Sequence, residues 1–356
     1  MKYFKKLLPI CIICVLALLL NSCGIVYLLT ADTENTVYEY NEDTEYDDYE
    51  YQDNTDKSSG ILKSPEDDGG EVSTPLMWRV SGNGFGGSFY LLGSIHVGLE
   101  DTNLYPDEVY DAYNSCEYLA VESDIIELEA DMEAQINSIQ FFLYNDGTLI
   151  SDHIDKALYS EAKILLKNYG IYDRYFDYYT PVMWEQMIDQ ILTEETVYEY
   201  DYGVDRYFLT QSKKLGKEII EIEDYIDTYA ALGSLSDGTQ EFLLREAIDP
   251  EYIESYSENL SELYGYWKRG VLSETEEYFY ADDGDYSAAE TEMLEEYNRA
   301  LLTDRNEVML DRAEDYLSDG MDVFYIVGLA HMLGDDGLVA ELTDAGYTVE
   351  LIGYAD

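Results

Sequence analysis

One eight-residue pattern occurs twice, near the two ends of the folded part of the chain, and each copy ends in a histidine. The copies are Phe89–His96 and Phe324–His331, and both read phenylalanine, tyrosine, two aliphatic residues, glycine, two variable residues and histidine. Such apolar runs are typical of strands that are covered on both faces. The glycine allows the backbone to turn, so each histidine is expected at the carboxyl end of its strand, where open α/β sheets bind ligands.

The order of the predicted elements indicates the fold class. Short apolar runs predict strands near both ends, whereas residues 127–320 have mostly helical periodicity. The predicted strands are residues 77–80, 89–92, 117–122, 217–222, 323–327 and 347–352. We therefore expect an α/β fold, with α+β as the alternative, in which N- and C-terminal strands build one central sheet and a large helical insertion separates them.

Charge and composition exclude some classes of function. The 356 residues contain 76 Asp and Glu against 20 Lys and Arg, a formal net charge of −56. No nucleic-acid partner is expected, because phosphate binding needs clustered basic residues. Hydrophobic residues make up 46% of the chain, which is enough for a substantial core.

The N-terminus predicts export and membrane anchoring. Residues 1–22 read as a signal peptide, with three early lysines and an apolar run, followed by Cys23 in a sequence typical of bacterial lipidation sites. The predicted location is the extracytoplasmic face of the cell membrane, where the lipid on Cys23 is the anchor. The alternative is an uncleaved transmembrane helix that extends to Leu29.

The sequence predicts that residues 23–75 form an acidic tether and that residues 76–356 form the folded domain. The tether is rich in Asp, Glu and Tyr and poor in aliphatic residues, so it cannot bury enough apolar surface to fold alone. Cys116 is the only other cysteine left after removal of the signal peptide and is expected in the core.

Two histidines and a glutamate form the candidate site. Imidazoles are common metal ligands, and His96 and His331 can converge if their strands share a sheet. Glu122 ends another predicted strand and is the best anionic partner, with Asp124 close behind it. Two histidines and a carboxylate are typical of hydrolytic metal sites. The alternative is that both histidines are structural and only form hydrogen bonds at the ends of their strands. The third histidine, His153, is expected at the surface.

These residues resemble a known family, TraB/GumN, which is related to the Tiki metalloproteases and the erythromycin esterase-like proteins. The matching blocks are residues 78–80, 90–98, 121–124, 203–205, 217–223, 305–306 and 327–337. Ser94 stands where the family usually has threonine, and Ile222 where it usually has leucine.

The resemblance implies that His96 and His331 are paired metal ligands and that Glu122 is their acidic partner. We expect Glu122 to act either as the carboxylate ligand or as the general base. Tiki-like relatives cleave peptides with a divalent metal ion, such as Mn, Co or Zn, whereas the erythromycin esterase-like relatives have no obvious metal. Glu223 ends a predicted strand and is the candidate second carboxylate.

Three further residues are expected to support the site. Arg305 is a candidate to stabilise an oxyanion or hold a substrate carboxylate, or else it forms a surface ion pair. Asp124 and Asn306 are candidates to orient a histidine, and Ser94 lies within the first histidine block.

The expected function is a membrane-anchored hydrolase that acts on peptides or small peptide-like substrates, with a divalent metal ion as cofactor. The first alternative is a non-catalytic lipoprotein that binds a metal or ligand in a regulatory role. The second is a hydrolase of the erythromycin esterase type that needs no metal.

Overall fold

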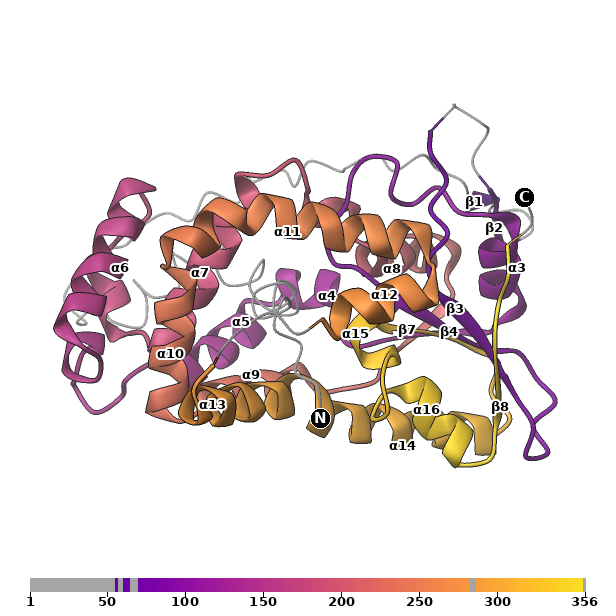
Figure 1. Cartoon of the computed structure of the whole chain (residues 1–356). Helices are drawn as coiled ribbons and strands as arrows, with labels where there is room; N and C mark the ends of the chain where they lie inside the picture. Colours follow the sequence, from indigo (N-terminus) through magenta and orange to yellow (C-terminus); the bar gives the residue numbers. More distant parts are fainter. Residues whose placement is uncertain (1–54, 57–59, 65–69, 282–285, 355–356) are drawn as a thin grey trace.

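The computed structural model describes residues 55–56, 60–64, 70–281 and 286–354. Its centre is a six-stranded sheet with the strand order β6-β5-β7-β4-β3-β8 (Figure 1). The strands are β3 (Met77–Ser81), β4 (Phe89–Ser94), β5 (Tyr118–Val121), β6 (Glu218–Glu221), β7 (Val323–Gly328) and β8 (Thr348–Leu351). Each predicted strand is present to within two residues. The mixed α/β class and the sheet built from both ends of the domain are therefore confirmed.

The four strands β6, β5, β7 and β4 run parallel, β3 runs antiparallel to β4, and β8 pairs antiparallel with β3 at the edge of the sheet. The two copies of the repeated pattern are neighbours, because β4 pairs directly with β7 and Ser94 lies opposite Gly328. Every residue of β7 is buried. The carboxyl ends of the four parallel strands consequently meet at one edge of the sheet.

Helices occupy most of the chain between β5 and β7, as the periodicity predicts. They are α4 (Ile125–Ala130), α5 (Met132–Ile139), α6 (Lys156–Asn168), α7 (Pro181–Glu194), α8 (Val204–Leu215), α9 (Tyr225–Gly233), α10 (Asp237–Ala247), α11 (Pro250–Arg269), α12 (Leu272–Phe279), α13 (Ala288–Asn298) and α14 (Asp304–Ser318). Three more lie outside this stretch: α3 (Asp107–Ser115), α15 (Leu329–Met332) and α16 (Leu338–Asp344). A π-helix, η5 (Arg299–Thr303), connects α13 to α14. The sheet lies at one end of the molecule, and α6, α7 and α10 lie at the other (Figure 1).

Helices cover both faces of the sheet, and two adjacent residues of β7 show how. Phe324 packs against Tyr113 of α3 and Phe208 of α8, with ring centroids 5.6 and 5.2 Å away. Tyr325 points to the opposite face, because side chains alternate along a strand. Its hydroxyl donates a hydrogen bond to the carbonyl of Met309 in α14. Burying each of these large rings stabilises the fold by roughly 1.5–3 kcal/mol.

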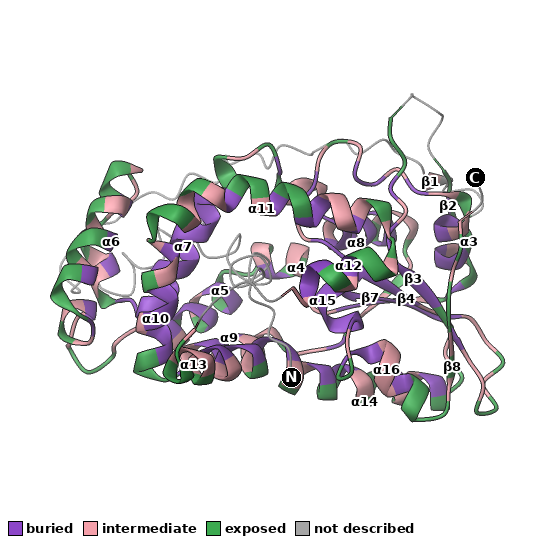
Figure 2. Cartoon of the chain, in the orientation of Figure 1, coloured by how far each residue is buried: buried purple, intermediate pink, exposed green. Residues whose placement is uncertain are grey.

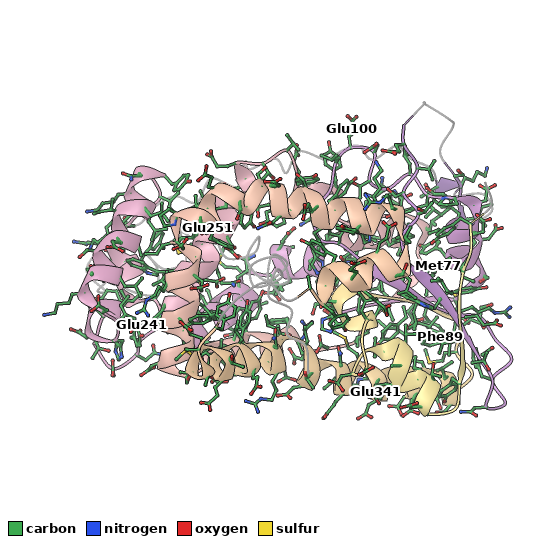
Figure 3. The ribbon with its side chains drawn as sticks, viewed as in Figure 1. Met77, Phe89, Glu100, Glu241, Glu251 and Glu341 are labelled. Atoms are coloured by element: carbon green, nitrogen blue, oxygen red, sulfur yellow. The ribbon has the colours of Figure 1, made fainter. Side chains whose placement is uncertain are left out.

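Buried and exposed residues separate between the interior of the molecule and its surface. Figure 2 shows the inner strands of the sheet and the inward sides of the helices as buried, whereas the edge strands β6 and β8 are exposed or intermediate. Met77 and Phe89 on the sheet are buried, whereas the acidic side chains of Glu100 and Glu251 project from the periphery and are exposed (Figure 3). Much of the negative charge therefore lies on the solvated surface, where charge is tolerated.

Part of the predicted tether packs against the domain. Leu62 is 1% exposed, and both its backbone groups hydrogen-bond to the side chain of Asn114. Ser73 is also buried, and its N–H donates to the carbonyl of Leu104. The expectation that all of residues 23–75 are solvated is wrong for these two positions, because isolated apolar and small residues find partners on a preformed surface.

The signal peptide and Cys23 lie outside the described residues. Within the described ranges, no helix is long and apolar enough to cross a membrane.

Candidate functional site

Four candidate residues follow the four parallel strands at the same edge of the sheet. His96 comes two residues after β4, and Glu122 comes directly after β5. Glu223 comes two residues after β6, and His331 follows β7 within α15. The parallel pairing of these strands therefore brings together side chains from distant parts of the sequence.

Three of these side chains surround one point beside Gly328. A Cβ atom built on this glycine would lie 3.4 Å from Oε1 of Glu122, 3.5 Å from Nε2 of His96 and 3.6 Å from Cδ2 of His331. The N–H of Gly328 also donates to Oε1 of Glu122 at 2.7 Å. The absence of a side chain at this position leaves room for a small group among all three residues.

Asp205 orients the imidazole of His96. Its Oδ2 lies 2.8 Å from Nδ1 of His96, and both side chains are largely buried, with exposed fractions of 7% and 13%. A Cβ on Gly203 would lie only 2.4 Å from the carbonyl oxygen of His96, so this glycine permits the close approach of α8 to the histidine loop. The carboxylate keeps the proton on Nδ1 and leaves the lone pair on Nε2.

Asn306 orients the second imidazole in the same way. Its Oδ1 lies 2.6 Å from Nδ1 of His331, and its Nδ2 donates to the carbonyl of Asp336. Because the amide nitrogen is already donating, the amide oxygen accepts the proton of Nδ1. Burial, with the positive charge of Arg305, lowers the pKa of His331 to about 3. This imidazole is therefore neutral at physiological pH, with its lone pair on Nε2.

Arg305 joins the two glutamates. Its guanidinium donates to Glu122, and it donates to Glu223 from Nε at 3.0 Å and from Nη2 at 2.6 Å. The three side chains are at most 16% exposed. The ion pair that was one of the two expectations for Arg305 is therefore present, but it is buried and joins two carboxylates of the site instead of a surface acid.

The two carboxyl groups respond differently to this environment. Burial opposes ionisation of Glu122, but Arg305, the imidazoles and the N–H of Gly328 outweigh it and hold the pKa of Glu122 well below its usual range. Burial raises the pKa of Glu223 although Arg305 acts in the opposite direction. Glu122 is thus ionised, with one oxygen bound to Gly328 and the other to Arg305.

A pocket with a free volume of about 50 Å³ adjoins these residues. One wall is apolar and is formed by Leu263, Trp267 and Phe279. Ser94 also lines the pocket, and its hydroxyl oxygen is buried with no hydrogen-bond partner in the described structure. A water molecule needs about 10–15 Å³ of such volume, and an engineered cavity that takes benzene has about 150 Å³. The pocket therefore has room for a water molecule and a small reacting group.

Other candidates lie apart from the imidazoles. The carboxylate of Asp124 caps α4 and pairs with Lys213 at 2.6 Å, so its contacts do not orient a histidine. The residue with that role at His96 is Asp205, which was not among the residues predicted from the sequence to orient a histidine. Its position in the block of residues 203–205 was the available signal. Cys116 is buried, which raises its pKa to about 12, and His153 stacks on Tyr144.

The side chains present do not fit a three-ligand metal centre in this arrangement. Two imidazole nitrogens are suitable donors, but each oxygen of Glu122 already has a partner. Within the described ranges, no group of three or more His, Cys, Asp or Glu side chains is placed to hold a metal ion. A metal bound by both imidazoles and Glu122 would have to share a carboxylate oxygen with Arg305 or with the N–H of Gly328.

The fold and the site together define an α/β protein with a paired histidine and carboxylate centre at the edge of its sheet. The sequence model of the TraB/PrgY/gumN family matches residues 76–351, which is most of the chain. The protein belongs to this family. No curated protein and no solved structure matches the chain significantly.

Proposed function

We propose that the protein is a hydrolase of amide or ester bonds in small peptide-like substrates, with His96 as general base. The observation that carries this proposal is the convergence of His96, His331 and Glu122 around one point beside Gly328. A group at that point meets the side of His96 that carries a lone pair. A water molecule bound just beyond that point, between the glycine and the three side chains, is the natural nucleophile.

The chemistry follows from the partners of the two imidazoles. Nε2 of His96 accepts a proton from water while the water oxygen attacks the carbonyl carbon of the substrate. The carboxylate of Asp205 stabilises the imidazolium that forms. His96 then returns the proton to the leaving nitrogen or oxygen, which yields a carboxylic acid and an amine or alcohol. His331 is neutral and accepts a hydrogen bond that holds the water.

Charge that develops on the carbonyl oxygen needs a donor. The hydroxyl of Ser94 is buried, lines the pocket and lacks a partner in the described structure, so it is available for this role. The guanidinium of Arg305 also lines the pocket and adds positive potential. The wall formed by Leu263, Trp267 and Phe279 favours a substrate with an apolar group beside the scissile bond.

The test is a screen of the full-length protein against short N-acetylated peptides and aryl esters, with three variants in parallel. We expect turnover that His96→Ala and His331→Ala abolish and that His153→Ala retains. His153 is the matched control, because it is the third histidine of the chain and does not line the pocket. Binding without turnover by any substrate would instead support the non-catalytic alternative.

We also propose export and anchoring through a lipid on Cys23. The support is the sequence of residues 1–23. Cells that produce the protein are expected to incorporate radiolabelled palmitate into it, and Cys23→Ser is expected to abolish the label. Label that persists in this variant contradicts the proposal.

A further inference from the structure

A second, larger hollow lies next to the catalytic pocket. Its volume is about 960 Å³, and residues of α12, η5, α14, α15 and α16 contribute to its walls. Ala330 lines both cavities, and Asn306, which holds His331, lines the larger one. Ligand sites in proteins are typically about 300–1,000 Å³, so this hollow is large enough for a molecule well beyond the size of water.

The charge of the lining is entirely negative. Four carboxylates face the hollow: Glu276, Asp335, Asp336 and Asp344. No lysine or arginine is among the described residues that line it. None of the four carboxylates forms an ion pair with another described residue. An uncompensated cluster of this kind attracts a cation.

Aromatic and apolar groups accompany the carboxylates. Trp78 and Tyr280 lie in the lining, with Leu272 and Leu302. Burial, followed by the nearby charges of Glu276, Asp335 and Asp336, raises the pKa of Tyr280, as expected if these carboxylates face its ring. Aromatic faces bind organic ammonium and guanidinium groups better than they bind hydrated inorganic ions.

An amide without a partner gives independent evidence for a ligand. Asn298, the last residue of α13, lines the hollow and is 9% exposed. Its side chain has no hydrogen-bond partner in the described part of the chain. Its amide atoms are not among the fully buried unpartnered atoms of the described structure, so they are open to the hollow, where a ligand can hydrogen-bond to them.

The same wall contains the π-helix. Leu302 and Thr303 of η5 line the hollow, and η5 leads directly into α14, whose second and third residues are Arg305 and Asn306. Such π-turns within helices are rare and occur frequently at functional sites. A ligand in the hollow would therefore contact the segment that positions the guanidinium and the imidazole of the catalytic pocket.

We propose that this hollow is a second binding site for an organic cation attached to apolar groups, and that the bound ligand contacts Asn306 and thereby His331. A peptide with a lysine or arginine side chain and a polyamine both have this chemistry. The amide of Asn298 binds a neutral polar group of the ligand, and the carboxylates of Asp335 and Asp336 bind its cation. The site does not depend on the proposed hydrolase activity, because binding can be measured without turnover.

The test is calorimetric titration of the full-length protein with N-acetyl-Leu-Lys-Leu-amide, N-acetyl-Leu-Gln-Leu-amide, spermidine and Mg²⁺. We expect the lysine peptide to bind and the glutamine peptide to bind about tenfold more weakly or worse, because a charged hydrogen bond contributes about 1.5–3 kcal/mol. Spermidine that binds with similar affinity supports the site and identifies the cation as the main determinant. Equal binding of the two peptides, or displacement of the lysine peptide by millimolar Mg²⁺, overturns the proposal.

Two double variants locate the binding. Asp335→Asn with Asp336→Asn should weaken the lysine peptide about tenfold, whereas Glu251→Gln with Glu254→Gln removes the same charge from α11 and should leave the affinity unchanged. An equal loss of affinity in both double variants would show that net charge causes the effect, and would overturn the proposed site. In NMR spectra, the lysine peptide should also shift the imidazole signals of His331 but not those of His153. An unchanged His331 signal on saturation contradicts the contact through Asn306.

Discussion

Nδ1 of His96 lies 2.8 Å from Oδ2 of Asp205, although 109 positions separate the two residues in the sequence. The contact joins the loop after β4 to the first turn of α8. It determines which nitrogen of the imidazole can accept a proton, and the role of His96 as general base depends on it.

Loss of the base or of its partner should reduce turnover to different extents. General-base catalysis contributes about 10²- to 10⁴-fold, so His96→Ala should lose that much of kcat. Asp205→Asn keeps the shape and a hydrogen bond but removes the charge, and should lose about 10- to 100-fold. The measurement is steady-state kinetics on the best substrate from the screen, with circular dichroism to check folding. Equal kcat in wild type and His96→Ala would exclude His96 as the base.

The burial of neutral His331 should make stability depend on pH. Its pKa is lowered from 6.5 to about 3, so between these values the unfolded chain binds a proton that the folded protein does not. The stabilising contribution is complete above pH 6.5 and is lost as the pH falls towards 3, with a slope of about 1.4 kcal/mol per pH unit.

The measurement for His331 is a comparison with His331→Gln by urea unfolding at pH 5 and pH 6.5. The difference between the two proteins is required, because burial raises the pKa of Glu185 to about 8 and this group produces the opposite slope over the same range. If the free energy of unfolding of wild type and of His331→Gln changed with pH in the same way, His331 would have an ordinary pKa in the folded state.

The arginine that links Glu122 and Glu223 should be important for stability. Arg305→Met leaves two buried carboxyl groups without their cation, and removing one member of a buried ion pair costs about 3–5 kcal/mol. Adding Glu122→Gln and Glu223→Gln to this variant should recover most of that loss, since the remaining amides are neutral. Urea unfolding measures both steps. A triple variant no more stable than Arg305→Met would show that the loss does not arise from unpaired charge.

Part of this site was predictable from the sequence. The repeated pattern implied that β4 and β7 lie in one sheet and that His96 and His331 share its edge, because parallel strands end together. The helix that begins at Pro181 and the one that ends at Gly216 were also predictable, since proline favours the first turn and glycine the left-handed cap.

The ion pairs of the site were not predictable from the sequence. The chain has 76 acidic residues, so the sequence does not say which of them Arg305 meets, and the answer depends on how α14 packs against the sheet. The contact between Asp205 and His96 depends likewise on the placement of α8. Leu62 was assigned to a tether because composition describes a segment by its average, whereas docking requires only a few apolar groups.

Removal of divalent metals should leave turnover unchanged. The reason is that, among the described residues, no three His, Cys, Asp or Glu side chains are placed to hold a metal ion, and both oxygens of Glu122 are hydrogen-bonded to Arg305 and Gly328. The measurements are kinetics before and after dialysis against EDTA, and metal analysis of wild type and the His96→Ala, His331→Ala double variant. Activity lost in EDTA and restored by Mn²⁺, Co²⁺ or Zn²⁺ would instead show that a metal ion takes part in the reaction.

The substitution Gly328→Ala should separate stability from activity. The backbone angles of Gly328, φ −49° and ψ 139°, are accessible to alanine, and the added Cβ would meet its nearest neighbours at 3.4–3.6 Å, which is ordinary van der Waals contact. The folded protein should therefore tolerate the change, and the reduced freedom of the unfolded chain should add about 0.4–1 kcal/mol of stability. The methyl group nevertheless projects from Gly328 towards Glu122, His96 and His331 and crowds the space just beyond it, where the attacking water is proposed to lie, so kcat should fall about 10²-fold or more.

Two other glycines serve as controls for this substitution. Gly238→Ala lies in α10 outside the pocket, where the new Cβ meets a flexible methionine at 3.4 Å, and both stability and kcat should be retained. Gly93→Ala would bring Cβ to 2.7 Å from Leu329 and should destabilise the protein. Thermal unfolding and kinetics of the three variants provide the comparison. A fully active Gly328→Ala protein of normal stability would show that no reacting water lies beside Gly328, and the proposed mechanism would then be wrong.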